Sequence, residues 1–193
     1  MGVVKLSTAG ILDYSKTSNF LSGNAPVSFA TGFDLLETTT LSTSASSVTF
    51  SGLGAYSDYR HLQVRAIVRA PTDNLFMRVN GVSTTDYAYH KIRGNGSTVA
   101  SSASSSNTQI AIAEISSTGE AAGIYSAMVL DVLDFGSSSK DTTFRSFHGK
   151  TGAGNRIGLS SGLFNSTAAV TSIEFYADTD MVSGVRFALY GSK

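Results

Sequence analysis

Residues 59–70 read YRHLQVRAIVRA, and this stretch shows most directly which kind of fold the chain adopts. Its even positions from 62 to 68 are all apolar, whereas Gln63, Arg65 and Arg69 lie on the opposite face. A period of two residues is typical of a β-strand with one buried face and one solvated face. Pro71 follows directly and ends the strand, because proline has no N–H to donate to a sheet.

Similar short apolar segments recur from Phe33 onwards, between turns rich in serine and glycine. Residues 124–133 are apolar on both faces, which is typical of a central strand covered on both sides. Further strands are predicted at residues 75–79, 86–92, 110–115, 144–148, 157–164, 170–177 and 185–190. We therefore expect an all-β domain over residues 33–193, a jelly-roll-like β-sandwich of about nine to ten antiparallel strands.

One segment within this region is expected to be a loop. Residues 97–107 read STVASSASSSN and carry almost no side chain large enough to support a core. Runs of serine and other small residues are typical of exposed loops.

Residues 1–32 are rich in Ser, Thr, Asn and Gly, and their apolar residues fit neither a strand period nor a helix period. Disorder is one interpretation, but disordered segments normally lack large apolar residues. We therefore expect an extended N-terminal arm, residues 1–32, that docks in a groove of a neighbouring subunit. The segment also lacks the apolar run of a secretory signal. The predicted contact residues of the arm are Val3, Val4, Leu6, Ile11, Leu12, Phe20, Leu21 and Phe29.

The charge balance argues against two classes of partner. The chain carries 14 Lys and Arg against 14 Asp and Glu, so its formal net charge is zero. Such a chain creates no strong field to attract nucleic acid or an anionic membrane, and we expect neither partner. There is no cysteine, which excludes disulfide bonds and thiolate metal sites.

Two glycine-rich segments invite comparison with nucleotide-binding loops. The sequence GKT at residues 149–151 has Phe144 where a phosphate-binding loop needs its first glycine. The sequence GAG at residues 152–154 has Ile157 where the dinucleotide-binding pattern needs its third glycine. Both segments are interpreted as turns, and we expect no cofactor.

Metal-ligating residues give no clear pattern either. His61, His90 and His148 are too widely spaced to chelate a metal locally, although they could converge in space. Four aspartates could offer oxygens to calcium, but they lack the complete pattern of an EF-hand loop and are interpreted as solvated turn residues. These aspartates are Asp131, Asp134, Asp178 and Asp180.

Catalytic residues cannot be assigned from residue types alone. Serine is so abundant that a Ser/His/Asp trio could be assembled by choice, so its presence carries no signal, and we expect no Gly-x-Ser-x-Gly elbow. A glycosidase would need a pair of carboxylates on one concave face, and nothing in the sequence brings two of the strand-like candidates together. We therefore expect no catalytic residue and no enzyme. The carboxylates considered are Asp86, Glu114, Asp131 and Glu174.

Several segments together resemble a family of structural proteins from tailed bacteriophages. The resemblance spans residues 33–193 and rests on the order of SVTFSGL (47–53), YRHLQVR (59–65), MRVNG (77–81), LDVLDF (130–135), RIGLSSGLF (156–164) and RFALYG (186–191). It implies a β-sandwich on the virion surface, either as a trimeric cement (decoration) protein over the capsid lattice or as part of a tail fibre.

The chain shows neither the heptad stalk nor the shaft repeat that a fibre usually carries, which favours the cement role. We therefore expect a non-enzymatic homotrimer, made in the host cytoplasm, that binds the major capsid protein at the outer capsid surface and bridges capsid subunits. The arm residues would make the subunit and capsid contacts. The alternative is a tail-fibre or receptor-binding module that binds glycans through the loop at residues 97–107 and through tyrosines, which stack well on sugar rings. These tyrosines are Tyr56, Tyr59, Tyr87, Tyr89, Tyr125 and Tyr176.

Overall fold

The computed structural model of the protein describes residues 32–152 and 154–193. The apolar residues predicted to make the contacts of the arm lie outside this part of the chain, and their role stays a prediction. They are Val3, Val4, Leu6, Ile11, Leu12, Phe20, Leu21 and Phe29.

The described residues form thirteen β-strands and one short 3₁₀-helix, η2 (Leu53–Tyr56). The main path of the larger sheet runs in the spatial order β1 (Asp34–Thr40), β13 (Arg186–Ser192), β3 (His61–Ala70), β9 (Ser126–Leu133), β10 (Thr142–Lys150), β11 (Arg156–Phe164), β5 (Tyr87–Gly94) and β6 (Val99–Asn107). The smaller sheet runs in the order β2 (Ala45–Ser51), β12 (Ser172–Met181), β4 (Asn74–Val79) and β7 (Ile110–Glu114).

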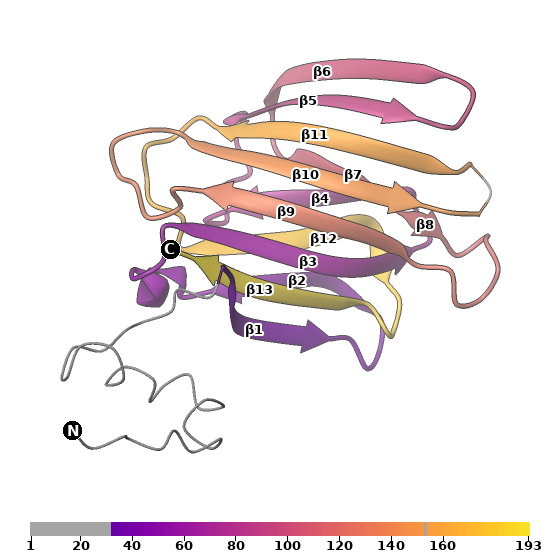
Figure 1. The fold of residues 1–193 in the computed structure, drawn as a ribbon, viewed down its shortest axis with the longest axis horizontal. Coiled ribbons are helices and arrows are strands. Elements are labelled where there is room, and N and C mark those ends of the chain that lie inside the picture. Colours follow the sequence, from indigo (N-terminus) through magenta and orange to yellow (C-terminus); the bar gives the residue numbers. More distant parts are fainter. Residues whose placement is uncertain (1–31, 153) are drawn as a thin grey trace, which may run out of the picture. The chain divides into compact units, whose positions relative to one another are not determined.

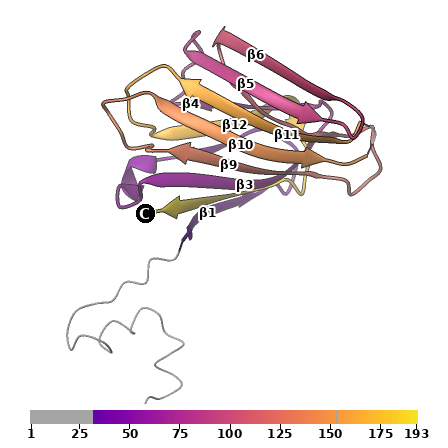
Figure 2. The same cartoon turned by 45° about the horizontal axis from the view of Figure 1, so that its top comes forward.

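All pairs along these two paths are antiparallel, and the two-residue strand β8 (Ser116–Ser117) pairs with β3 in parallel. Figures 1 and 2 show the smaller sheet packed against one face of the larger sheet. The other face of the larger sheet has no second layer of described strands. The two sheets are therefore unequal, and the wider one is covered on one side.

The core lies between the two sheets and is built from their inward-facing side chains. On β3, Leu62, Val64 and Val68 are buried, which confirms the strand and the face predicted from the alternating pattern. Phe175 of β12 stacks on Phe187 of β13 with ring centroids 5.0 Å apart. This aromatic contact therefore joins the two sheets across the core.

The predicted all-β, jelly-roll-like sandwich is confirmed, with two differences in detail. The described chain has thirteen strands, where about nine to ten were expected from the spacing of the apolar segments. The sheets also differ in width, with nine strands in one, including β8, and four in the other.

The prediction of a loop at residues 97–107 is wrong. Val99–Asn107 forms β6, which pairs antiparallel with β5 at the end of the larger sheet. Its serine and alanine side chains bury little surface, so the strand is held by backbone hydrogen bonds to β5. Side-chain composition does not report such bonds, and the strand was missed for that reason.

The expectation that residues 124–133 are covered on both faces is also wrong. β9 lies in the middle of the larger sheet, between β3 and β10. Met128 and Leu130 face the core, but Ala127 is exposed and Val129 is half-exposed on the other side. An apolar strand face therefore stands uncovered in the described part of the chain.

The two faces of the larger sheet can be distinguished by stability measurements. Phe175→Ala removes a fully buried ring and should lower the free energy of unfolding by about 3–5 kcal/mol. Phe147→Ala removes a ring that is 51% exposed and should change the free energy of unfolding by less than about 1 kcal/mol. Urea titrations measure both values, and equal losses would contradict this assignment of the faces.

Candidate functional site: an apolar band on the outer face

The exposed apolar side chains of the larger sheet gather on the face away from the smaller sheet, which we call the outer face. Cross-strand pairing places Ile92 of β5 beside Leu159 of β11, and Leu159 beside Phe147 of β10. Phe147 in turn pairs with Val129 of β9. These residues form the first of two neighbouring apolar rows.

The second row lies two residues further along the strands. It crosses the sheet through Val99, Gly94, Ile157, Gly149, Ala127 and Ile67, which pair in that order. The two glycines have no side chain, so this row is hollowed between its apolar residues. We call the apolar residues of both rows the outer band: Ile67, Ile92, Val99, Ala127, Val129, Phe147, Ile157 and Leu159.

The exposure of the outer band is high for large apolar side chains. Phe147 is 51% exposed, Leu159 54%, Ile157 55% and Val99 74%. Single exposed apolar residues are common on proteins and need no explanation, whereas the largest contiguous apolar patch of a protein is often a functional surface. The outer band therefore has the character of an interaction surface.

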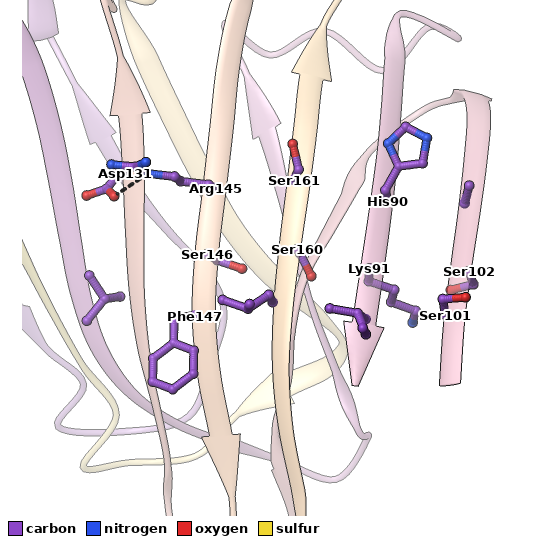
Figure 3. A pocket seen from close by; sticks show the side chains of 14 residues that line it. His90, Lys91, Ser101, Ser102, Asp131, Arg145, Ser146, Phe147, Ser160 and Ser161 are labelled. Atoms are coloured by element: carbon purple, nitrogen blue, oxygen red, sulfur yellow. Dashed lines mark hydrogen bonds and ion pairs between the residues drawn. The ribbon is translucent and has the colours of Figure 1, made fainter. Parts of the chain in front are cut away.

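A row of polar side chains borders the outer band. Arg145 Nε donates a hydrogen bond of 2.9 Å to Asp131 Oδ2 (Figure 3). The other oxygen of Asp131 accepts one of 2.8 Å from Gln63 Nε2. Gln63 Oε1 accepts a 2.8 Å bond from Arg65 Nε. The Arg65 guanidinium lies over the Tyr190 ring, 4.6 Å from its centroid. The border is therefore a connected polar row that carries both signs of charge.

A groove of about 750 Å³ lies where the outer band meets this polar row (Figure 3). Two smaller hollows, of about 550 Å³ and 350 Å³, share Val129 with it. The groove combines one exposed aromatic ring with hydroxyl and charged groups from β5, β6, β9, β10 and β11. Its labelled lining residues in Figure 3 are His90, Lys91, Ser101, Ser102, Asp131, Arg145, Ser146, Phe147, Ser160 and Ser161.

The inward side of the same strands carries a buried ionic cluster. Glu114 of β7 accepts a short hydrogen bond from Arg93 and lies 2.6 Å from Arg156 Nε and 3.9 Å from Lys91 Nζ. Burial by itself would raise the pKa of Glu114. The hydrogen bond from Arg93 and the charges of Arg93, Arg156 and Lys91 outweigh it, so the pKa is lowered. These contacts tie β7, at the edge of the smaller sheet, to β5 and β11.

His148 lies beside this cluster on the inward face of β10 and is buried. Burial lowers the pKa of the imidazole to about 4, with a further lowering from Lys91 and an opposing effect of Glu114. Gly158 is its partner on β11, and a Cβ added there would lie 2.4 Å from His148 Nε2. The glycine therefore makes room for a neutral imidazole ring.

Residues 158–162 read GLSSG and match the Gly-x-Ser-x-Gly pattern of a catalytic serine, which the sequence reasoning overlooked. That pattern requires the serine to sit on a sharp turn between a strand and a helix. Ser160 instead lies in the middle of β11, buried on its inward face. The surroundings of Ser160 do not have the geometry of a nucleophile elbow.

The three histidines considered as metal ligands have different surroundings. His61 Nδ1 accepts a 2.9 Å hydrogen bond from the N–H of Asp134, His90 is exposed on the outer face, and His148 is buried inside. Within residues 32–152 and 154–193, no group of three or more His, Cys, Asp or Glu side chains could hold a metal ion. The same residues contain no helix long and apolar enough to cross a membrane.

The candidate carboxylates are dispersed as well. Glu114 lies inside the sandwich, Asp131 lies on the outer face, and Glu174 lies on β12 of the smaller sheet. Asp134 bonds Lys140 and Arg60, and these two hydrogen bonds lower its pKa to about 2. Asp86 accepts a short hydrogen bond from Thr84, whereas Asp178 and Asp180 are exposed on β12. No pair with the geometry of a glycosidase is formed by these side chains.

The tyrosines proposed to stack on sugars do not gather on the outer band. Tyr87 is buried, and its hydroxyl accepts from the Val79 N–H at 2.9 Å and donates to the Val82 carbonyl at 2.9 Å. Tyr125 donates to the Ser183 carbonyl at 2.8 Å. The others pack against the core or bond neighbouring side chains: Tyr56, Tyr59, Tyr89 and Tyr176.

Comparisons with known proteins leave the family open. No protein-family model matches the sequence, and no curated protein matches it. A solved structure with some likeness is the exo-inulinase from Aspergillus awamori, with a TM-score of 0.32 and 13% sequence identity. The likeness covers 90% of this chain and 34% of the inulinase, so this chain spans about a third of that protein. A likeness this low supports no argument about activity.

The expectation that the protein is not an enzyme is corrected at this point. It rested on the lack of a catalytic pattern in the sequence, and such a lack does not exclude catalysis; the solved structure with some likeness is itself that of an enzyme. The exclusion of enzymatic activity is therefore withdrawn, and no activity is assigned in its place.

The neutral state of His148 predicts a loss of stability in acid. Its pKa is about 4 in the folded protein and about 6.5 when exposed, so the unfolded chain binds the proton more readily. The stability that this group contributes is complete above pH 6.5 and falls as the pH drops towards 4, by about 3 kcal/mol.

His148→Gln should remove most of this extra loss between pH 7 and pH 4, as measured by urea unfolding at each pH. His90→Gln, at an exposed histidine, is the matched control and should keep the pH dependence of the wild type. A His148→Gln variant that loses as much stability in acid as the wild type would refute the assignment.

Proposed function

We propose that this chain is a structural protein of a bacteriophage virion, a cement or decoration protein that binds the outer surface of the capsid and bridges its subunits. The observation that supports the proposal best is the outer band, a contiguous apolar surface on the uncovered face of the larger sheet. The outer band runs across six neighbouring strands, as suits a protein that lies on a shell. The resemblance to phage structural proteins supplies the identity of that shell.

The size of the outer band favours many weak contacts over one strong contact. It crosses six strands about 4.8 Å apart in two rows, which corresponds to an area on the order of 300–400 Å². A stable interface of standard size buries about 800 Å² on each partner. The band alone is therefore too small for a tight one-to-one complex, whereas a repeated contact on a lattice gains from multivalency.

We propose that the outer band binds the major capsid protein. The capsid protein would contact it with an apolar patch that is bordered by groups of both charges. The connected row Arg145–Asp131–Gln63–Arg65 offers both signs of charge at the border of the band. The proposal includes a homotrimer, in which three bands are held on one lattice and each raises the effective concentration of the others. The arm of residues 1–32 would add contacts to subunits or capsid.

A second candidate function is a glycan-binding module of the phage tail. It is favoured by the groove of about 750 Å³, which is lined by the exposed Phe147, by Ser101 and Ser161, and by the Asp131–Arg145 pair. An apolar ring beside such polar groups suits the two kinds of surface that a sugar presents. This candidate predicts binding to host cells in place of phage heads.

Co-sedimentation with heads of the parent phage that lack this protein tests the proposal, with host cells as a parallel sample. The wild type should saturate the heads at many copies per particle and leave the cells unbound. Phe147→Asp should weaken binding to heads by about tenfold or more, because it places a charge in the apolar contact.

Thr143→Asp is the matched control, since Thr143 lies on the same strand and face but outside the outer band. It should bind as the wild type does. Binding of the wild type to cells and not to heads would transfer the function to the tail. Equal binding of heads by Phe147→Asp and the wild type would remove the outer band from the contact.

A further inference from the structure

β6 is an edge strand with unusual exposure. It pairs with β5 and with no other described strand, so the backbone N–H and C=O groups of its outer edge face away from the sheet. Most of its side chains are exposed, on both faces of the sheet. β7, the edge strand of the smaller sheet, packs against β10, β11 and β5 but does not reach beneath β6. The position of β6 at the end of the larger sheet can be followed in Figures 1 and 2.

The chemistry of β6 leaves this edge open. Exposed edges are normally blocked by charged side chains, proline or a bulge, because they otherwise pair with other chains. β6 reads VASSASSSN and contains no charged residue and no proline. Its ladder with β5 is regular from Val99 to Ser104, and the irregularity lies at the other end, where Ser106 has a φ of 58°.

The other edge strands differ from β6 in charge, in register or in burial. β1, at the opposite edge of the larger sheet, carries Asp34 and Glu37 and an irregular register between Leu35 and Glu37. In the smaller sheet, β2 places Val48 and Phe50 in the core, and β7 is buried along its whole length. Among the described edges, β6 is the one that is uncharged, exposed on both faces and regular over six consecutive residues, from Val99 to Ser104.

We propose that β6 pairs with β6 of a second copy of this chain, antiparallel, and joins the two larger sheets into one. An antiparallel pair of identical strands has twofold symmetry, so both copies use the same surface. Opposed serines and alanines bring no like charges together, which makes the strand compatible with itself. Main-chain hydrogen bonds supply the attraction, as in other cases of strand addition.

The pairing goes beyond the proposed function and does not depend on it, because it needs the edge strand alone. It also has a consequence for the outer band. Val99 lies at the β6 end of the band, so joined sheets would place the two bands on one continuous face, offset from each other along the strands. A twofold contact of this kind can link two single copies or two trimers.

Disulfide trapping tests the pairing, because the chain has no cysteine of its own. Single variants S101C, S102C, A103C and S104C place one thiol at successive positions of the regular part of β6. In a twofold antiparallel pair, identical residues meet only near the symmetry axis. Mild oxidation should therefore give dimers on a non-reducing gel roughly tenfold faster at one or two of these positions than at the others.

S139C is the control, since Ser139 is exposed in the loop between β9 and β10. Four β6 variants that cross-link no faster than S139C would overturn the proposal. The outcome is separate from shell binding: a variant that cross-links through β6 but does not bind heads would support the pairing and refute the cement function.

A second measurement uses charge to block the edge. The double variant S101K/A103K places lysines on β6, where both side chains are exposed, so folding should be retained and is checked by circular dichroism. The double variant should therefore associate more weakly. Sedimentation velocity should give a dissociation constant for its dimer, or for its pair of trimers, that is roughly tenfold higher than that of the wild type. S138K/S139K is the matched control with the same added charge, and equal association of the two variants would overturn the proposal.

Discussion

A β-sheet has two faces, and the four-stranded sheet of this protein packs against one face of a much wider partner. The buried side of that partner supplies the core, through residues such as Val64, Leu130 and Phe187. The other side has no described layer over it, although β9, β10 and β11 carry apolar residues there. The outer band, its polar border and the groove between them all follow from this inequality of the two sheets.

The part of the fold that could be predicted from sequence is the part in which the two faces of a strand differ in chemistry. In β3, Leu62 and Val64 alternate with Gln63 and Arg65, so the strand and its buried face were both predicted. β6 could not be predicted in this way, because its serines and alanines are alike on both faces and its pairing depends on backbone bonds.

β11 shows why the candidate site was not predicted. Ile157 and Leu159 alternate with Gly158 and Ser160, and such a pattern favours burial of the apolar set. The structure buries the small residues instead, because side chains from neighbouring strands occupy the inward space. The His148 ring lies against Gly158, and Ile110 of β7 approaches Gly162, where an added Cβ would lie 3.0 Å from it. Periodicity separates two faces, but it does not say which of them a partner covers.

The larger sheet therefore has a partly polar interior and an apolar exterior at this end. Glu114 and its cations hold β7 against β5 and β11 from within, and the Ser146 hydroxyl of β10 bonds the Ile112 carbonyl of β7. A buried carboxylate of this kind is tolerated because several cations surround it, and it would be costly if left unpaired. The same strands are thus fixed from inside while they present Phe147 and Leu159 outside. A rigid support of this kind suits a surface that must match a partner.

The central claim is that the outer band is covered in the assembled particle. Ala127→Cys introduces a single thiol into the band with a small change of side chain, and its rate of labelling by a maleimide can be measured on free protein and on decorated heads. The account predicts that labelling slows by about tenfold or more on the heads, while Ser139→Cys, outside the band, is labelled equally in both states. Equal labelling of the band thiol in both states would contradict the account.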